Sequence, residues 1–393
     1  MDDLKYEVWF AHIKNVGPSK KRKLRELYPD AKELYDHKGF TGKNIMWLGN
    51  KEVAGINEAQ KKDPEALCDN LIRKDIRLVT CRMETFPRRL KEISNAPYAL
   101  FYKGNMVEDN LNSAAIVGSR SCTSYGEREA LNYGEALARA GFQVISGMAK
   151  GIDGAGQRGA LRGGRSFGIL GCGVDICYPQ QNKGLYEELC RYGGVISEYA
   201  PGEPPLPANF PARNRIISAF SDVVLVMEAK GKSGSQITVD FALEQGKDIY
   251  ALPGPVSCAH SKGCHILIKQ GAGILISPED LISDLLFADY VTVSSDNSNQ
   301  TVNKESERIK QKTGNPSPEY LTETSEGNSP DIKNFLESTE SMVYSFLDFF
   351  PKGVGQLASE TKLSIPDLLE GLSGLELKGL VRELGAGHYI RKI

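Results

Sequence analysis

Short runs of apolar, often β-branched residues alternate with amphipathic segments through the middle of the chain. The runs span 114–117, 143–146, 167–170, 194–197, 223–227, 249–252 and 273–276. Several are apolar throughout, as strands buried on both faces are. The segments between them have helical spacing, for example 127–140 and 236–245. This alternation predicts βαβ units and a doubly wound parallel sheet, to which 79–104 adds one or two strands.

Both ends of the chain show helical periodicity instead. In 1–75, short apolar helices are separated by Gly and Asn, and a Gly-Pro-Ser turn places Ser19 at the N-cap of a helix over 20–28. This pattern resembles a helix–hairpin–helix or SAM-type module. In 331–393, three predicted helices precede a hairpin with a Gly-rich turn, which is typical of a small winged helix.

A polar stretch over 294–330 separates the winged helix from the sheet. Tyr320 is its only aromatic residue, and such a composition buries too little apolar surface to fold alone. We therefore expect four parts: a helical module over 1–75, an α/β domain over 76–290, a flexible linker over 291–330 and a winged helix over 331–393.

Composition and charge narrow the class of protein. The chain has 393 residues and a formal net charge of -2, so any nucleic-acid surface is a local patch on a neutral body. The first residues are acidic and carry no apolar signal segment, and no uncharged apolar run approaches the ~18 residues of a membrane span. The eight cysteines include no CxxC pair, which favours reduced thiols. We expect a cytoplasmic protein without a membrane segment.

Glycine-rich turns follow several of the predicted strands. In the first, Gly118, Ser119 and Arg120 come directly before a helix, whose first backbone amides are expected to point outward and unpaired. Gly118 would let a phosphate approach, Ser119 would donate a hydrogen bond and Arg120 would bind bidentately. The alternative is that Gly118 only permits a tight turn.

The second turn, 146–154, contains Gly147 and Lys150, and the third, 231–235, contains Lys232. The third turn is a nest of small residues, with Ser233, Gly234 and Ser235 opening a helix. Since the carboxyl ends of parallel strands share one edge of a sheet, the three turns should converge on one ligand. Neither a dinucleotide fingerprint after the first strand nor a P-loop signature is present.

A fourth segment, 209–218, has Pro211 at the expected first position of a helix. Arg213 and Arg215 lie two residues apart and should point in different directions. One of them could instead pair with an acidic residue, Glu198 or Asp222, and brace the sheet. Phe210 is either a platform for base stacking or a plug in the core.

These segments occur in the order of a known family. The motifs are IVGSR (116–120), SGxAxGID (146–153), GxGxDxxYP (171–179), SEY (197–199), FPxRNRxI (210–217), SGSxIT (233–238) and LPG (252–254). Together they resemble the DNA-processing protein A (DprA, or Smf) family over about 85–280. The resemblance implies an extended Rossmann-like domain between a SAM-like module and a winged helix.

The resemblance also implies a function. Family members bind incoming single-stranded DNA in the cytoplasm during natural transformation, protect it and help load the RecA recombinase. The domain is expected to dimerise, with no cofactor and no catalytic step. The DNA site would comprise the turn and segment residues together with two flanking lysines: Gly118, Ser119, Arg120, Gly147, Lys150, Lys183, Phe210, Arg213, Arg215, Ser233, Gly234 and Ser235.

Two positions depart from the family pattern, and their roles stay open. Gln157 stands where the family usually has His, and Cys264-His265 replaces Thr-Asn. With Cys258 and His260, the latter pair gives four residues of metal-binding type. Their order is not a standard zinc spacing, so no metal is expected.

Two other functions compete with DNA binding by the α/β domain. A nucleotide-processing enzyme resembling the LOG phosphoribohydrolases would need a catalytic Glu where this chain has Thr238, although Asp153, Asp175 and Glu198 could serve acid/base chemistry. A duplex-binding regulator would use the winged helix and the basic run 20–25, which is otherwise a solvated helix face.

Overall fold

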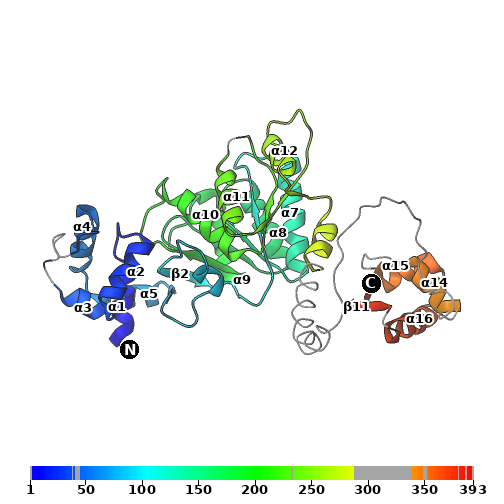
Figure 1. Cartoon of the computed structure of the whole chain (residues 1–393), viewed down its shortest axis with the longest axis horizontal. Coiled ribbons are helices and arrows are strands. Elements are labelled where there is room, and N and C mark those ends of the chain that lie inside the picture. Colours follow the sequence, from blue (N-terminus) through cyan, green and yellow to red (C-terminus); the bar gives the residue numbers. More distant parts are fainter. Residues whose placement is uncertain are drawn as a thin grey trace, which may run out of the picture. The chain divides into compact units, whose positions relative to one another are not determined.

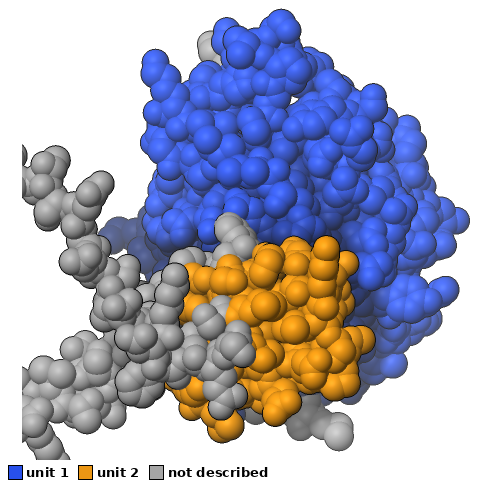
Figure 2. All heavy atoms as spheres, turned by 90° about the vertical axis from the view of Figure 1, so that its right-hand side faces the viewer, with its two compact units in different colours: residues 1–285 blue, residues 286–393 orange. Residues whose placement is uncertain are grey.

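The computed structural model describes residues 2–37, 39, 45–231, 233–286, 338–347, 352–378, 380–385 and 387–391. The chain forms two compact units, residues 1–285 and 286–393 (Figure 2). The predicted linker and Lys232 lie outside the described residues. The four-part division stays a prediction.

The first unit combines helices with one large sheet (Figure 1). Its helices are α1 (Asp2–Ala11), α2 (Pro18–Leu27), α3 (Ala31–Asp36), α4 (Asn50–Ala59), α5 (Pro64–Arg73), α6 (Arg88–Lys91), α7 (Ser124–Arg139), α8 (Ile152–Gly163), the 3-10 helix η1 (Gln180–Asn182), α9 (Lys183–Tyr192), α10 (Asn209–Phe220), α11 (Gly234–Glu244) and α12 (Lys262–Lys269). Its strands are β1 (Arg77–Thr80), β2 (Ala99–Gly104), β3 (Ser113–Val117), β4 (Gln143–Ser146), β5 (Ser166–Ile169), β6 (Gly194–Ser197), β7 (Val223–Val226), β8 (Asp248–Ala251) and β9 (Gly273–Ile274).

The sheet order is β1-β2-β6-β5-β4-β3-β7-β8-β9. In this order, all neighbouring strands from β6 through β5, β4, β3, β7 and β8 to β9 pair in parallel. At the other edge, β2 pairs antiparallel with β6, and β1 pairs antiparallel with β2. This confirms the doubly wound sheet. From β3 the chain builds outward to β6 and then returns to place β7 beside β3. The topological switch point therefore lies between β3 and β7, where open α/β sheets bind ligands.

Helices cover both faces of the sheet, which explains why the apolar runs of the sequence contain almost no polar residues. In β3, Ala114 and Ile116 belong to the core shared with α7 and α8, whereas Ala115 and Val117 belong to the core shared with α10 and α11. Successive side chains of a strand point to opposite faces, so a strand covered on both sides is apolar at most positions, as β7 is throughout.

The N-terminal helices α1–α5 share a core with the sheet. Phe10 packs edge-on against Tyr98, with ring centroids 4.7 Å apart, and Trp9 Nε1 donates to the carbonyl of Ala59 (2.7 Å). The prediction of Ser19 as an N-cap is wrong, because α2 begins at Pro18, two residues before the predicted start. Pro18 occupies the first helical position, where its missing N–H costs nothing, and Gly17 is the N-cap.

Much of the basic run on α2 makes internal contacts. Lys20 Nζ lies 2.6 Å from Glu52 Oε1, and Lys21 Nζ donates to the carbonyl of Ala11 (2.9 Å). Arg25 is buried and donates to the hydroxyl of Tyr98 (3.0 Å). These cations hold the helical region together and against the sheet, so the run is neither a plain solvated face nor a free phosphate grip.

The second unit has the elements of a winged helix. They are α14 (Ser338–Phe346), α15 (Val354–Thr361), α16 (Ile365–Leu377), β10 (Lys352–Gly353), β11 (Val381–Gly385) and β12 (His388–Arg391), with strand order β10-β12-β11. Val343, Leu357, Leu372 and Val381 are in its core. Sequence periodicity predicted the helices and the hairpin but not β10. Across the described residues of both units, no helix has the length and apolar character that a bilayer crossing requires.

Candidate functional site

The turn after β3 is fixed by a hydrogen bond to the segment that follows β7. The N–H of Ser119 donates to the carbonyl of Glu228 (2.7 Å), and the N–H of Ser121 donates to Ser119 Oγ (3.2 Å). A Cβ on Gly118 would lie 2.8 Å from that Glu228 carbonyl and from Ile152 Cγ1. Gly118 is therefore required by packing, and the turn presents the side chains of Ser119 and Arg120.

Backbone amides at the start of α7, the helix that follows this turn, already have hydrogen-bond partners within the chain. The carboxylate of Glu228 accepts from the N–H of Thr123 (2.9 Å) and from its hydroxyl (2.5 Å), and Thr123 Oγ1 accepts from the N–H of Gly126 (3.2 Å). The expectation of outward, unpaired amides at the first turn is therefore wrong at these positions. The buried carboxylate of Glu228, two residues after the end of β7, already supplies the negative charge that this helix start favours.

The start of α11 has a different environment. Ser233 is its N-cap but accepts no capping hydrogen bond, and its hydroxyl lies 2.5 Å from that of Ser235. A Cβ on Gly234 would meet no atom within 4 Å. The third turn thus leaves open space at a helix start.

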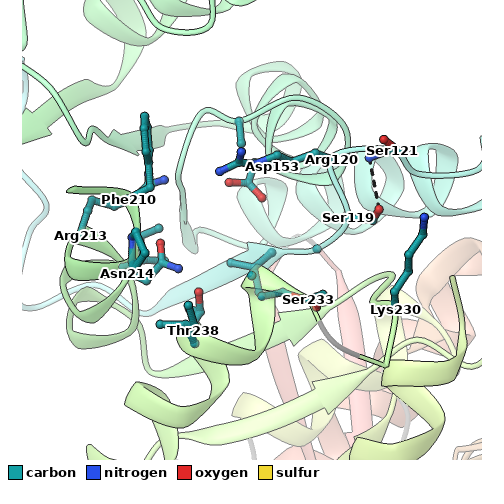
Figure 3. A pocket seen from close by; sticks show the side chains of 18 residues that line it. Ser119, Arg120, Ser121, Asp153, Phe210, Arg213, Asn214, Lys230, Ser233 and Thr238 are labelled. Carbon is teal, nitrogen blue, oxygen red and sulfur yellow. Dashed lines mark hydrogen bonds between the residues drawn. The ribbon is translucent and has the colours of Figure 1, made fainter. Parts of the chain in front are cut away.

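The predicted turns converge on a cavity of about 410 Å³ at the switch point. Its lining includes Ser119, Arg120, Ser233, Gly234 and Ser235. Figure 3 shows Phe210 on one side of the cavity and Lys230 on the other, the side where Ser119 and Ser121 lie. Three turns far apart in sequence therefore contribute to one site.

Arg213 lies in the wall of this cavity with only 4% of its surface exposed. Its Nη1 donates to the carbonyl of Ile169, and its Nε has no hydrogen-bond partner among the described residues. A Cβ on Gly147 would lie 2.7 Å from Arg213 Cζ, so Gly147 provides the space that the guanidinium fills. Burial lowers the Arg213 pKa to about 10, against the opposing effect of Asp153.

Asp153 is the carboxylate of the described cavity lining. Its Oδ2 accepts from the N–H of Gly147 (3.1 Å). Burial raises its pKa, while nearby Arg213 acts in the other direction. The two residues lie within electrostatic reach, and Arg120 adds a second guanidinium to the same lining.

A second hollow of about 240 Å³ adjoins the first, and both are lined by Arg120, Phe210 and Arg213. The Arg120 guanidinium lies 5.8 Å from the centroid of the half-buried Phe210 ring. On the other side Tyr178, 44% exposed, lies 5.4 Å from Phe210 between ring centroids, and Lys150 also lines this hollow. Phe210 therefore lines two hollows and is not a sealed core residue.

Arg215 points away from both hollows, as its spacing from Arg213 predicted. It is buried, its Nη1 and Nη2 each lie 2.6 Å from an oxygen of Glu198, and its Nε donates to the carbonyl of Asn95 (2.9 Å). These contacts match the bracing alternative, with Glu198 rather than Asp222 as the partner. Pro211 is the third residue of α10, not the first as expected, because the helix begins at Asn209.

Lys183, expected as a flanking phosphate contact, is outside the lining of both hollows. Lys183 is exposed at the start of α9, 3.9 Å from Glu187. Gln157, whose role was left open, is fully buried and bridges the turn after β4 and strand β5, accepting from the N–H of Met148 (3.1 Å) and donating to the carbonyl of Phe167 (2.9 Å). Its contacts indicate a structural role.

The cysteine and histidine cluster makes ordinary backbone contacts. Cys264 is buried and donates from Sγ to the carbonyl of Val226 (3.4 Å), and His265 Nε2 lies 3.0 Å from the carbonyl of Gly254. Within the described residues, no group of three or more His, Cys, Asp and Glu is arranged to hold a metal ion.

Sequence reasoning missed Lys230 and Glu228. Lys230 lines the cavity two residues after the carboxylate that caps α7. The available signal was position alone, since both residues directly follow the apolar run of β7, at the edge where the other turns converge.

The fold and this cavity define an α/β protein with a basic cavity at the switch point of a doubly wound sheet. A family model described as DNA recombination-mediator protein A matches residues 77–286, and one described as DprA winged helix domain matches 328–387. The chain belongs to the DNA recombination-mediator protein A family.

Relatives match over long stretches. Protein Smf of Synechocystis sp. is 30% identical over 399 residues, covering 98% of each protein. DNA processing protein DprA of Streptococcus pneumoniae is 42% identical over 205 residues, which cover 52% of this chain and 72% of the relative.

Solved structures agree with this relationship. The crystal structure of the Streptococcus pneumoniae protein has a TM-score of 0.60 and 34% identity, covering 71% of this chain and 97% of that one. DNA processing protein A of Helicobacter pylori, described for its single-stranded DNA binding mode, has a TM-score of 0.50 and 28% identity, covering 55% and 98%.

Proposed function

We propose that this chain binds single-stranded DNA through the two adjoining hollows, protects incoming DNA in the cytoplasm and helps load the RecA recombinase during natural transformation. The observation that carries the proposal is the basic cavity at the switch point, continued past Arg120 and Phe210 into a second hollow that contains Lys150 and Tyr178. Cations beside exposed aromatic rings suit phosphates and unstacked bases of a single strand. The Helicobacter pylori relative is described as binding such a strand.

The proposal is tested by replacing Arg120 with Ala. We expect single-stranded DNA affinity to fall about ten-fold or more, because a charge-assisted contact to phosphate is lost. Fluorescence anisotropy with single-stranded and duplex oligonucleotides measures it, and Arg162→Ala, an exposed arginine 3.8 Å from Glu135, is the matched control. Equal affinity of the native chain for duplex, or an unchanged Arg120→Ala variant, contradicts the proposal.

RecA loading is a separate part of the proposal. If the chain delivers RecA to a bound strand, adding it shortens the lag of RecA assembly on single-stranded DNA. The Arg120→Ala variant should lose this effect together with DNA affinity.

The proposal includes a homodimer formed through the sheet domain. Exposed apolar side chains occur on the edge strand β9 and in the chain on either side of it: Ile274 (48% exposed) in β9, Ile276 (77%) after it and Ile266 (40%) in the preceding helix α12. Replacing Ile266 and Ile276 with Glu should convert the dimer to a monomer in analytical ultracentrifugation. Ile72→Glu on α5, at a position as exposed as Ile276 (77%), is the control. A native chain that sediments as a monomer refutes this part.

A further inference from the structure

The charges lining the described part of the switch-point cavity do not balance. Arg120, Arg213 and Lys230 contribute three cations, and Asp153 contributes the one carboxylate. A phosphodiester within a strand carries a single negative charge, whereas a phosphate monoester carries about −1.5 to −2 at neutral pH. The excess of two positive charges matches a monoester better than a diester.

The start of α11 supplies further donors on the same lining. This helix has 11 residues, its N-cap Ser233 makes no capping hydrogen bond, and Gly234 faces open space. Ser233 and Ser235 add two hydroxyls. An uncapped helix start favours an anion, in contrast to the start of α7, which Glu228 already caps.

Arg213, one of the three cations counted above, also favours an anionic ligand because it is nearly buried. Only 4% of its surface is exposed, it lines the same cavity, and its Nε has no hydrogen-bond partner among the described residues. The Nε itself is buried, so an anion in the cavity would meet the part of the guanidinium that lines it, and the low dielectric of a buried site strengthens that attraction.

We infer that the cavity binds a phosphate monoester and therefore holds the phosphorylated end of a DNA single strand. This inference rests on the proposed function. The phosphate would lie between the start of α11, with Lys230 and Ser235, and the guanidinium groups of Arg120 and Arg213, and the base would lie towards Phe210, which Figure 3 shows on the side away from Lys230. The strand would then continue into the second hollow along Tyr178 and Lys150. A free nucleoside monophosphate has the same chemistry and is the other source to test.

The test compares four internally labelled thymidine oligonucleotides of equal length by anisotropy: 5′-phosphorylated, 3′-phosphorylated, unphosphorylated and circular. We expect one phosphorylated end to bind at least about ten-fold tighter than the unphosphorylated and circular strands. Thymidine monophosphate should compete away that excess. A Lys230→Gln, Ser235→Ala variant should lose the preference, whereas Lys269→Gln, exposed on α12, should keep it.

Equal affinity for all four strands overturns the inference. If binding then still depends on Arg120, the proposed single-strand function stands without end recognition. Binding of thymidine monophosphate, measured by calorimetry, without binding of any strand would support the monoester site and contradict the single-strand function. A preference that survives in the Lys230→Gln, Ser235→Ala variant would show that the end is recognised elsewhere.

Discussion

At the scale of single residues, the two arginines of α10 have separate tasks. Arg213 faces the cavity, and Arg215 forms a buried ion pair with Glu198, whose side chain is 11% exposed. A buried pair adds modest net stability, but removing one partner leaves an uncompensated charge. The spacing of the residues predicted their divergence, and only the fold determined which one faces the ligand.

Replacing Arg215 with Ala should lower the free energy of unfolding by about 3–5 kcal/mol, because Glu198 is left buried and unpaired. Urea denaturation measures this loss. The double variant Arg215→Met, Glu198→Leu should recover most of it and bind single-stranded DNA like the native chain. A loss of affinity in the folded double variant as large as that of Arg120→Ala would support direct DNA contact by Arg215.

His12 makes stability depend on pH. Burial lowers its pKa to about 4, its Nδ1 lies 2.7 Å from the carbonyl of Val8, and its ring packs edge-on against Phe101 of β2. In the unfolded chain the side chain titrates near 6.5. Between pH 6.5 and 4 the unfolded state thus binds a proton that the folded state does not, and stability falls as the pH drops, by about 3 kcal/mol at pH 4.

The comparison variant is His12→Gln, which keeps a donor for Val8 but does not titrate. Urea denaturation at pH 7 and pH 4.5 should show a larger loss of stability in the native chain than in this variant. Equal losses would rule out His12 as the source.

At the scale of elements, strand ends position the site. The apolar runs of the sequence predicted β3 to β9 closely, because β3 to β7 are buried on both faces and leave a clear pattern, and they predicted that the turns converge. They did not reveal that Glu228, just after β7, caps the start of α7, whereas the start of α11 has no side-chain cap. That difference depends on Glu228, which is more than 100 residues from Thr123 in sequence.

The turn after β4 should tolerate no side chain at Gly147. In Gly147→Ala, the new methyl group would displace the Arg213 guanidinium, and single-stranded DNA affinity should fall about ten-fold or more. Gly184→Ala on α9 is the control, since a Cβ there meets no atom within 4 Å. Native affinity in Gly147→Ala would show that the placement of Arg213 does not matter for binding.

At the scale of the whole molecule, a nearly neutral chain concentrates cations at one site. The formal net charge is -2, yet three of the four charged residues lining the described cavity are basic. In the second unit, α16 carries Asp367, Glu370 and Glu376 and no Lys or Arg between 365 and 377. Single-strand binding is therefore expected from the first unit.

The salt dependence of single-strand affinity tests this account most directly. The logarithm of the binding constant should fall linearly with the logarithm of salt concentration, with a slope near −0.7 for each phosphate neutralised. Removing Arg120 should make the slope less steep by about 0.7, and Arg162→Ala should leave it unchanged. A native slope near zero, or identical slopes in the native chain and Arg120→Ala, would contradict a phosphate-binding role for the switch-point cavity.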